Sequence, residues 1–151
     1  MKNNKKGFTL VELLAVIVIL AVIILIAVTA VIPRMNKAKW KSFGDEALAF
    51  LKAADEKSVA DDGGDGLCYV ITTDLVESYV KKSDGTTYSG IVCRQDGNSD
   101  WKIYIKQTNK DKYVINGKTS NQISTSLGNA ATGSITSGKT SCPTDYTSWT
   151  C

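Results

Sequence analysis

The sequence predicts an α+β protein in which one long N-terminal helix packs on one face of a small antiparallel sheet. Three features support this prediction: an apolar run at residues 13–32, a run of helical period at 36–60, and short β-rich segments between residues 67 and 116. The chain has 151 residues. Beyond the apolar run, this length leaves room for one small core.

The apolar run predicts a membrane-spanning helix. About 20 residues long, it would cover roughly 30 Å as a helix, the thickness of the hydrocarbon core of a bilayer. It is interrupted only by Thr29, whose hydroxyl can bond back to its own helix. A helix satisfies its own backbone in lipid and an isolated strand does not, so the β-branched residues do not indicate a strand. A buried core helix of a soluble domain is the alternative, and runs of this length are uncommon there.

The basic residues at the N-terminus predict the orientation of that helix. Lys2, Lys5 and Lys6 precede the apolar run, which places this end in the cytoplasm and everything after residue 32 outside. These three lysines also account for the whole formal charge of +3, since the remaining basic and acidic residues number 15 each. The neutral body has no general basic footprint, so nucleic acid is not an expected partner.

Residues 36–60 predict an amphipathic helix that carries the sheet. Its apolar residues recur at helical spacing and charged residues occupy the other sides. Gly63 and Gly64 end the pattern. Together with the apolar run it predicts a single long helix, bent near Pro33. The residues expected to face the sheet are Trp40, Phe43, Ala47, Phe50, Leu51 and Ala54.

The sheet is predicted from segments 67–72, 87–95, 101–107 and 112–116. In the third of these, Trp101, Ile103 and Ile105 alternate with polar neighbours, which indicates one buried face. The connections are short and contain Gly, Asn and Asp, so we expect an antiparallel meander. Segment 73–80 predicts a short helix capped by Asp74, with Glu77 three residues later.

Residues 119–150 are about half Ser and Thr and contribute little core. We expect irregular loops that lie over the folded domain. This segment forms either a plain solvated surface or a variable exposed patch that carries O-linked glycans.

All four cysteines follow the apolar run, where an oxidising compartment favours disulfides. The expected bridges are Cys68–Cys93 and Cys142–Cys151. The alternative pairing is Cys93–Cys142 with Cys68–Cys151. A zinc site is disfavoured by the spacing and by the absence of histidine, so no metal is expected.

Catalysis finds little support in the sequence. Without histidine there is no Ser–His or Cys–His pair. No glycine-rich phosphate loop follows a predicted strand. We therefore expect a protein that is not an enzyme and needs no cofactor.

The N-terminal end of the apolar run carries one acid, Glu12, and Gly7 lies five residues before it. A carboxylate close to the apolar zone of a bilayer is costly, and such residues are usually functional. A conventional secretory signal peptide cut after Ala27 or Ala30 is the alternative. Pro33 and the basic residues behind it fit that arrangement poorly.

The segment "KKGFTLVELL" at residues 5–14 resembles the N-terminal signature of type IV prepilins and pseudopilins. The resemblance extends over about residues 5–28. It implies cleavage between Gly7 and Phe8 by a prepilin peptidase, N-methylation of Phe8, and an assembly role for Glu12. It also implies a leader at 1–7, a transmembrane and filament-core helix at 8–35, and an extracellular head at 36–151. Family members commonly carry a proline where this chain has Thr29.

The resemblance implies a structural subunit that polymerises through its N-terminal helix into a surface filament. Such filaments serve adhesion, twitching motility or DNA uptake. The expected partners are further copies of the chain, the prepilin peptidase, and an assembly machinery with a separate ATPase. The expected location is the membrane before assembly and the extracellular filament afterwards. Two alternatives remain open: a minor pilin or pseudopilin of a secretion or competence system, and a membrane-tethered binding domain that does not polymerise.

Overall fold

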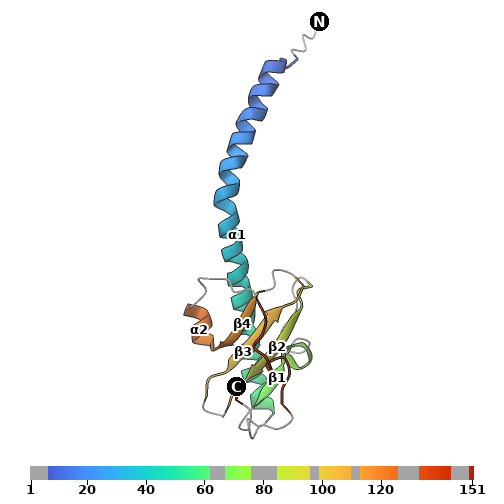
Figure 1. Cartoon of the computed structure of the whole chain (residues 1–151), viewed down its shortest axis with the longest axis vertical. Coiled ribbons are helices and arrows are strands. Elements are labelled where there is room, and N and C mark those ends of the chain that lie inside the picture. The colour runs from blue at the N-terminus through green and yellow to red at the C-terminus, as the bar shows by residue number, and fades with distance from the viewer. Residues whose placement is uncertain are drawn as a thin grey trace, which may run out of the picture. The chain divides into compact units, whose positions relative to one another are not determined.

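The computed structural model describes residues 7–61, 67–75, 85–95, 99–109, 113–125, 133–143 and 150–151. The chain divides into two compact units, Met1–Ala38 and Lys39–Cys151. Its elements, shown in Figure 1, are α1 (Leu10–Ala60), β1 (Cys68–Val70), η1 (Ile71–Leu75), β2 (Tyr88–Cys93), β3 (Lys102–Gln107), β4 (Val114–Lys118) and α2 (Ser120–Thr125). The α+β architecture predicted from the sequence is confirmed.

One helix contains both predicted helical segments. The apolar and amphipathic runs belong to α1, which continues through Pro33. A stretch of α1 near the N-terminus is long and apolar enough to cross a membrane, and none of it is buried. The Thr29 hydroxyl donates to the Ile26 carbonyl at 2.9 Å, so its polar group is satisfied within the helix. The bend near Pro33 stays a prediction.

In the second unit, α1 forms half of the core. All six residues expected to face the sheet are buried. Phe43 lies at the centre of an aromatic cluster, with its ring centroid 5.6 Å from that of Trp40 and 5.8 Å from that of Tyr113. Phe50 meets Tyr88 edge to face at 5.5 Å. Aromatic contacts of this geometry add to the free energy gained from burial alone.

The strands form an antiparallel meander in the order β1-β2-β3-β4, as predicted. Along β3 the buried residues alternate with partly exposed ones, so one face of the sheet packs on α1. The register places Val92 opposite Ile103, and both belong to the core. The strand residues of this inner face that join the core are Tyr69, Tyr88, Val92, Ile103, Ile105 and Ile115.

Three polar contacts join the sheet side of the core to α1 and to Asp61, the residue directly after it. The Tyr88 hydroxyl donates to the Glu46 carboxylate. Trp101 Nε1 donates to Asp55 Oδ1 at 3.1 Å, and the Tyr69 hydroxyl donates to Asp61 Oδ2 at 3.1 Å. Each bond satisfies the polar tip of an aromatic side chain whose ring lies against the core.

Gly90 in β2 is required by its surroundings. Its φ is +134°, and a Cβ at this position would lie 1.9 Å from the Tyr104 carbonyl oxygen of β3. A contact that short with backbone cannot be relieved by a rotamer change. Only glycine therefore fits where β2 passes β3 at this point.

Two local predictions are corrected. Residues Ile71–Leu75 are π-helical, so the helix starts before Asp74 and Asp74 does not cap it. Its carboxylate accepts instead from the Val70 N–H at 2.7 Å and from the Thr73 hydroxyl at 3.0 Å. This side chain bonds back to the end of β1 because the strand leads directly into the turn. Residues 76–80 of the predicted helix, Glu77 among them, lie outside the described residues.

The Ser/Thr-rich segment also contains a short helix that was not expected. In α2 the side chain of Ile123 is buried. The Thr119 N–H donates to Gln122 Oε1 at 3.1 Å, one half of a capping box. The pattern T-x-x-Q at residues 119–122 was the available signal.

We expect residues 36–151 to be soluble and monomeric without the apolar half of α1, because every core residue lies in the second unit. Circular dichroism should show a mixed α/β spectrum, and size-exclusion chromatography a monomer. A fragment that starts at residue 45 is the control. It lacks Trp40 and Phe43 and should not fold. Aggregation of the longer fragment with both disulfides formed would contradict this expectation.

Candidate functional site

The N-terminus of α1 is capped by a reciprocal capping box. Thr9 precedes the helix, and its carbonyl accepts the first helical bond from the Leu13 N–H at 3.2 Å. The Glu12 N–H donates to Thr9 Oγ1 at 3.3 Å, and the Thr9 N–H donates back to Glu12 Oε2 at 2.9 Å. The Thr9 hydroxyl adds a third bond to the same carboxylate oxygen at 2.9 Å. Two N–H groups without helical partners are satisfied in this way.

The capping box gives Glu12 a structural role that the sequence argument missed. The signal was the T-x-x-E pattern at residues 9–12, which ends just before the apolar run. The carboxylate also lies in the first turn, where the helix dipole favours a negative charge. Glu12 is therefore held at the helix terminus, four residues after Phe8. Its pairing with another subunit stays a prediction.

Gly7 and Phe8 lie just outside the helix. Residues 7–9 have no regular structure, and Phe8 is 87% exposed. Among the described residues, no atom lies within 4 Å of the position a Cβ on Gly7 would take. The packing of this chain therefore gives no reason for a glycine at residue 7. A requirement for glycine there would come from another molecule, such as a protease cleft.

The apolar half of α1 is an uncovered surface. Every large apolar side chain from Leu10 to Met35 is at least 46% exposed, on all sides of the helix. A helix that is apolar all round needs either lipid or other helices around it. This surface and the Gly7–Glu12 segment form one continuous candidate site.

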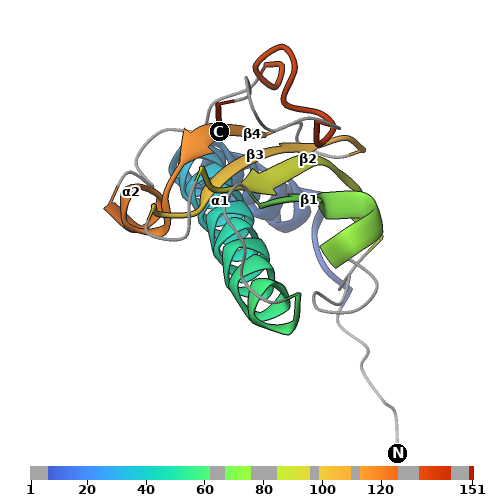
Figure 2. The same cartoon turned by 90° about the horizontal axis from the view of Figure 1, so that it is seen from below.

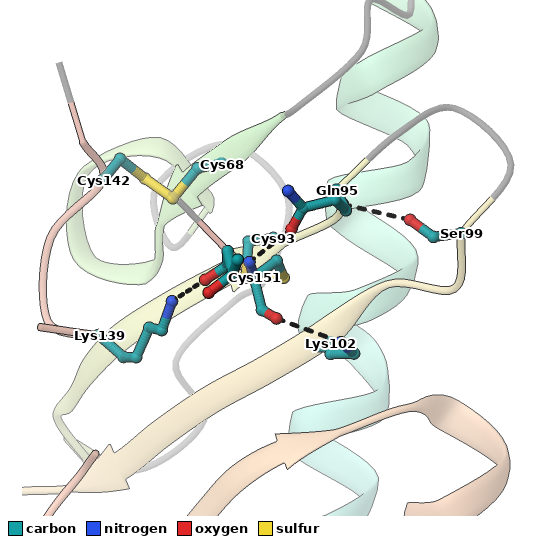
Figure 3. Close-up of a disulfide and its surroundings, with 9 residues drawn as sticks. Cys68, Cys93, Gln95, Ser99, Lys102, Lys139, Cys142 and Cys151 are labelled. Carbon is teal, nitrogen blue, oxygen red and sulfur yellow. Dashed lines mark hydrogen bonds between the residues drawn. A yellow bond between two sulfur atoms is a disulfide. The ribbon is translucent and has the colours of Figure 1, made fainter. Parts of the chain in front are cut away.

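The predicted disulfide pairing is wrong, and so is the alternative. The bridges are Cys68–Cys142 and Cys93–Cys151, with Cα–Cα distances of 5.6 and 5.8 Å. Figure 3 shows both beside the ends of β1 and β2. All four cysteines are bonded in these two bridges.

The position of the C-terminal segment, described here at residues 133–143 and 150–151, explains this pairing. Val92 faces α1, so its neighbours Ile91 and Cys93 point to the opposite, outer face of the sheet, and both are fully buried there. Cys68 is the register partner of Cys93 and shares that face. Residues 133–143 pass over this face (Figure 2), which brings Cys142 to Cys68, and Cys93 bonds to Cys151 on the same face.

Non-covalent contacts hold the same segment on the outer face. Asn116 of β4 donates through Nδ2 to the Ser134 carbonyl at 3.2 Å and accepts at Oδ1 from the Thr136 N–H at 3.0 Å. The Lys139 ammonium lies 5.6 Å from the centroid of the Tyr104 ring. The prediction that the Ser/Thr-rich segment lies over the domain is confirmed for residues 133–143.

The last two residues are held by side chains from β3 and the loops. The Cys151 N–H donates to Gln95 Oε1 at 2.8 Å, and Lys102 Nζ donates to the Cys151 carbonyl oxygen at 3.2 Å. Lys139 Nζ donates to the Thr150 carbonyl oxygen (Figure 3). Burial lowers the pKa of Lys139, and the positive charge of Lys102 lowers that pKa further.

A cavity of about 360 Å³ lies between α1 and the connection from β2 to β3. Its wall includes Leu48, Asp55, Arg94 and Trp101, with the Arg94 guanidinium 4.7 Å from the Trp101 ring centroid. Within the described ranges, no three His, Cys, Asp or Glu side chains gather as a metal site.

Residues 2–28 match the family model for the prokaryotic N-terminal methylation motif. The match includes Gly7, Phe8 and Glu12 and the first part of α1, and it ends before the second unit begins. Comparison with curated proteins found no match, and comparison with solved structures found none either. The motif identified from the residues is thus confirmed independently at the N-terminus.

Replacing Thr9 by Val should increase fraying of the first turn of α1. Valine keeps the branched shape and removes the hydroxyl that caps Glu12. Loss of a Thr cap should raise hydrogen exchange at the Glu12 amide about fivefold. The measurement is exchange on the full chain in detergent micelles. Thr29→Val is the control, because that hydroxyl bonds within the helix and caps nothing. Unchanged exchange in the Thr9 variant would show that the box does not hold the helix end.

Proposed function

We propose that this chain, whose N-terminal segment carries the methylation motif of type IV pilins and pseudopilins, is a structural subunit of a type IV pilus. The observation that supports this most strongly is the apolar half of α1, exposed on all sides and preceded by one capped acid. Lipid covers that surface before assembly, and neighbouring copies of the same helix cover it in a filament. The fold, with its long N-terminal helix and antiparallel sheet, is that of a pilin.

The proposed processing and assembly of the subunit have four stages. The chain inserts with Lys5 and Lys6 inside, and prepilin peptidase removes residues 1–7 and methylates Phe8. The helix at 8–35 holds the subunit in the membrane as a reservoir and is then drawn into the filament core. The head at 36–151 coats the fibre outside the cell. Extension and retraction depend on a separate ATPase in the assembly machinery. Adhesion, twitching motility and DNA uptake are the roles open to such a fibre.

We propose that Glu12 selects the axial register of subunits. Cleavage after Gly7 creates an amine on Phe8, four residues from the carboxylate. Within the described residues, the side-chain bonds to Glu12 all end on Oε2. Oε1 therefore remains available to the ammonium of a neighbouring chain. Between apolar helices, where the dielectric constant is low, such an ion pair favours one register over others.

Two alternatives make different predictions. A minor pilin or pseudopilin shares the processing chemistry but is scarce in sheared surface filaments. A membrane-tethered binding domain keeps its leader and tolerates replacement of Glu12. The experiments below distinguish a tethered domain from a polymerising subunit. Abundance in sheared surface filaments distinguishes a major pilus subunit from a minor pilin or pseudopilin.

Gly7→Val should leave a full-length precursor in the membrane, because the side chain obstructs the peptidase and meets no atom of the described residues. Intact mass of the membrane protein reports leader removal and the added methyl group together. Ala15→Val is the matched control. It places the same side chain on the exposed helix beyond the cut site, where processing should be normal. Unprocessed wild-type protein starting at Met1 on the surface would refute the proposal.

Glu12→Val should leave insertion and cleavage intact and abolish or greatly reduce filaments, since the helices lose the ion pair that sets register. Glu12→Gln should be intermediate. Immunoblots compare shear-released protein with total membrane protein.

Thr9→Val separates assembly from capping, because it weakens the box but keeps the carboxylate. Filaments should persist in this variant. If Thr9→Val reduces filaments as much as Glu12→Val does, Glu12 acts only as a cap. Normal filament yield with Glu12→Val would favour the tethered domain.

A further inference from the structure

The two strand cysteines are placed to bond to each other. Cys68 and Cys93 are register partners in the antiparallel pair β1–β2 and lie on the same face. Directly opposed residues of antiparallel strands have Cα atoms about 4.5–5.5 Å apart, within the range that a disulfide spans. The structure nevertheless bonds each of them to the C-terminal segment. The sheet therefore accommodates two pairings, one within β1–β2 and one between the sheet and the segment that covers it.

Sequence separation favours bridges between consecutive cysteines, which the native structure does not contain. The native bridges join residues 74 and 58 positions apart. Bridges between consecutive cysteines, 68 to 93 and 142 to 151, would join residues 25 and 9 positions apart. With contact probability falling as the −3/2 power of separation, Cys68 meets Cys93 about 5 times more often than Cys142 in an unfolded chain. Cys151 meets Cys142 about 16 times more often than Cys93.

The order of export also favours the Cys68–Cys93 bridge. This step rests on the proposed function, in which the head crosses the membrane with its N-terminal end leading. Cys68 and Cys93 then reach the oxidising side before Cys142 and Cys151. They lie opposite each other as soon as β1 and β2 pair, whereas the native partners arrive last.

An oxidised chain cannot correct such a pairing by itself. The sequence has four cysteines, and all are bonded in the native state, so no internal thiol remains to attack a bridge. Disulfide exchange requires a thiolate. The isomer would keep the β1–β2 ladder and the α1 core, but its C-terminal segment would be released from the outer face. Gln95 and Lys102 would lose their contacts with Cys151.

We propose that Cys68–Cys93 with Cys142–Cys151 forms first, and that a thiol–disulfide isomerase outside the membrane converts it into the native pairing. The isomerase thiolate attacks Cys68, forms a mixed disulfide and releases the Cys93 thiolate. Cys93 attacks Cys151 and releases the Cys142 thiolate. Cys142 then attacks Cys68 in the mixed disulfide and regenerates the isomerase thiolate. Two disulfides are present at the start and at the end, so the catalyst is neither oxidised nor reduced overall.

The contacts of the C-terminal segment supply the driving force. Asn116 holds residues 134 and 136, and Lys139 lies over Tyr104 and bonds to Thr150. These contacts need the segment to lie on the outer face, where Ile91 and Cys93 are fully buried. The native pairing tethers Cys142 and Cys151 to the strand cysteines on that face and so favours these contacts, whereas the consecutive pairing provides no such tether. Exchange through a catalytic thiol therefore runs toward the native bridges.

The test is oxidative refolding of the full chain in detergent. The reduced chain is released from denaturant in two arms: diamide without any thiol, or a glutathione redox buffer with purified protein disulfide isomerase. Peptide mapping without reduction identifies the bridges. Random pairing of four cysteines gives each isomer about one third of the product. The thiol-free arm should exceed that share for Cys68–Cys93 with Cys142–Cys151, and the isomerase arm should yield the native pairing.

A double variant tests the geometry directly. With Cys142→Ser and Cys151→Ser, mild oxidation of the refolded chain should join Cys68 to Cys93 and protect both from alkylation. Native pairing in equal yield in both arms would overturn the proposal, as would dominance of Cys68–Cys151 with Cys93–Cys142 in the thiol-free arm. Because neither leader cleavage nor filaments enter these measurements, their outcome is independent of whether the chain assembles into a pilus.

Discussion

The structure depends on one continuous helix that meets two different surroundings. In its first half, α1 is apolar on every side and exposed throughout. In its second half, one aromatic stripe is buried against the sheet while the remaining sides carry charge. A helix provides its own backbone hydrogen bonds in both settings, which a strand does not. The same element can therefore serve as a membrane anchor at one end and as half of a core at the other.

The sheet in turn depends on being covered on both faces. Four short strands on one helix stripe bury little apolar surface, and small domains of this size often need covalent support. Residues 133–143 cover the outer face, and the two bridges anchor the segment near the ends of β1 and β2. In the loop-entropy relation, closing loops of this length stabilises the fold by about 4 kcal/mol per bridge before strain is subtracted. A polar segment with almost no core of its own thereby becomes part of the domain.

At the N-terminus a single acid caps the helix and, in the proposed function, also pairs with a neighbouring subunit. The capping box orders the first turn of α1 and holds the Glu12 carboxylate at the helix terminus. It does so with one carboxylate oxygen, so capping and the proposed pairing with a neighbouring amine do not compete for the same atom. The acid belongs to a local motif that can form before any second subunit is present. Assembly would then use a group already in place.

The sequence by itself determined the elements whose signals are local. The stripe from Trp40 to Ala54 and the alternation along β3 were predicted with the correct buried face, because periodicity reports which side of an element meets the core. The capping patterns at Thr9 and Thr119 were also present in the sequence. Only the tertiary structure decided the disulfides. Chain separation favours consecutive cysteines, but the choice depends on which face of the sheet Cys68 and Cys93 share and on the C-terminal segment crossing that face. That crossing is made by contacts between residues far apart in the chain, which no local pattern encodes.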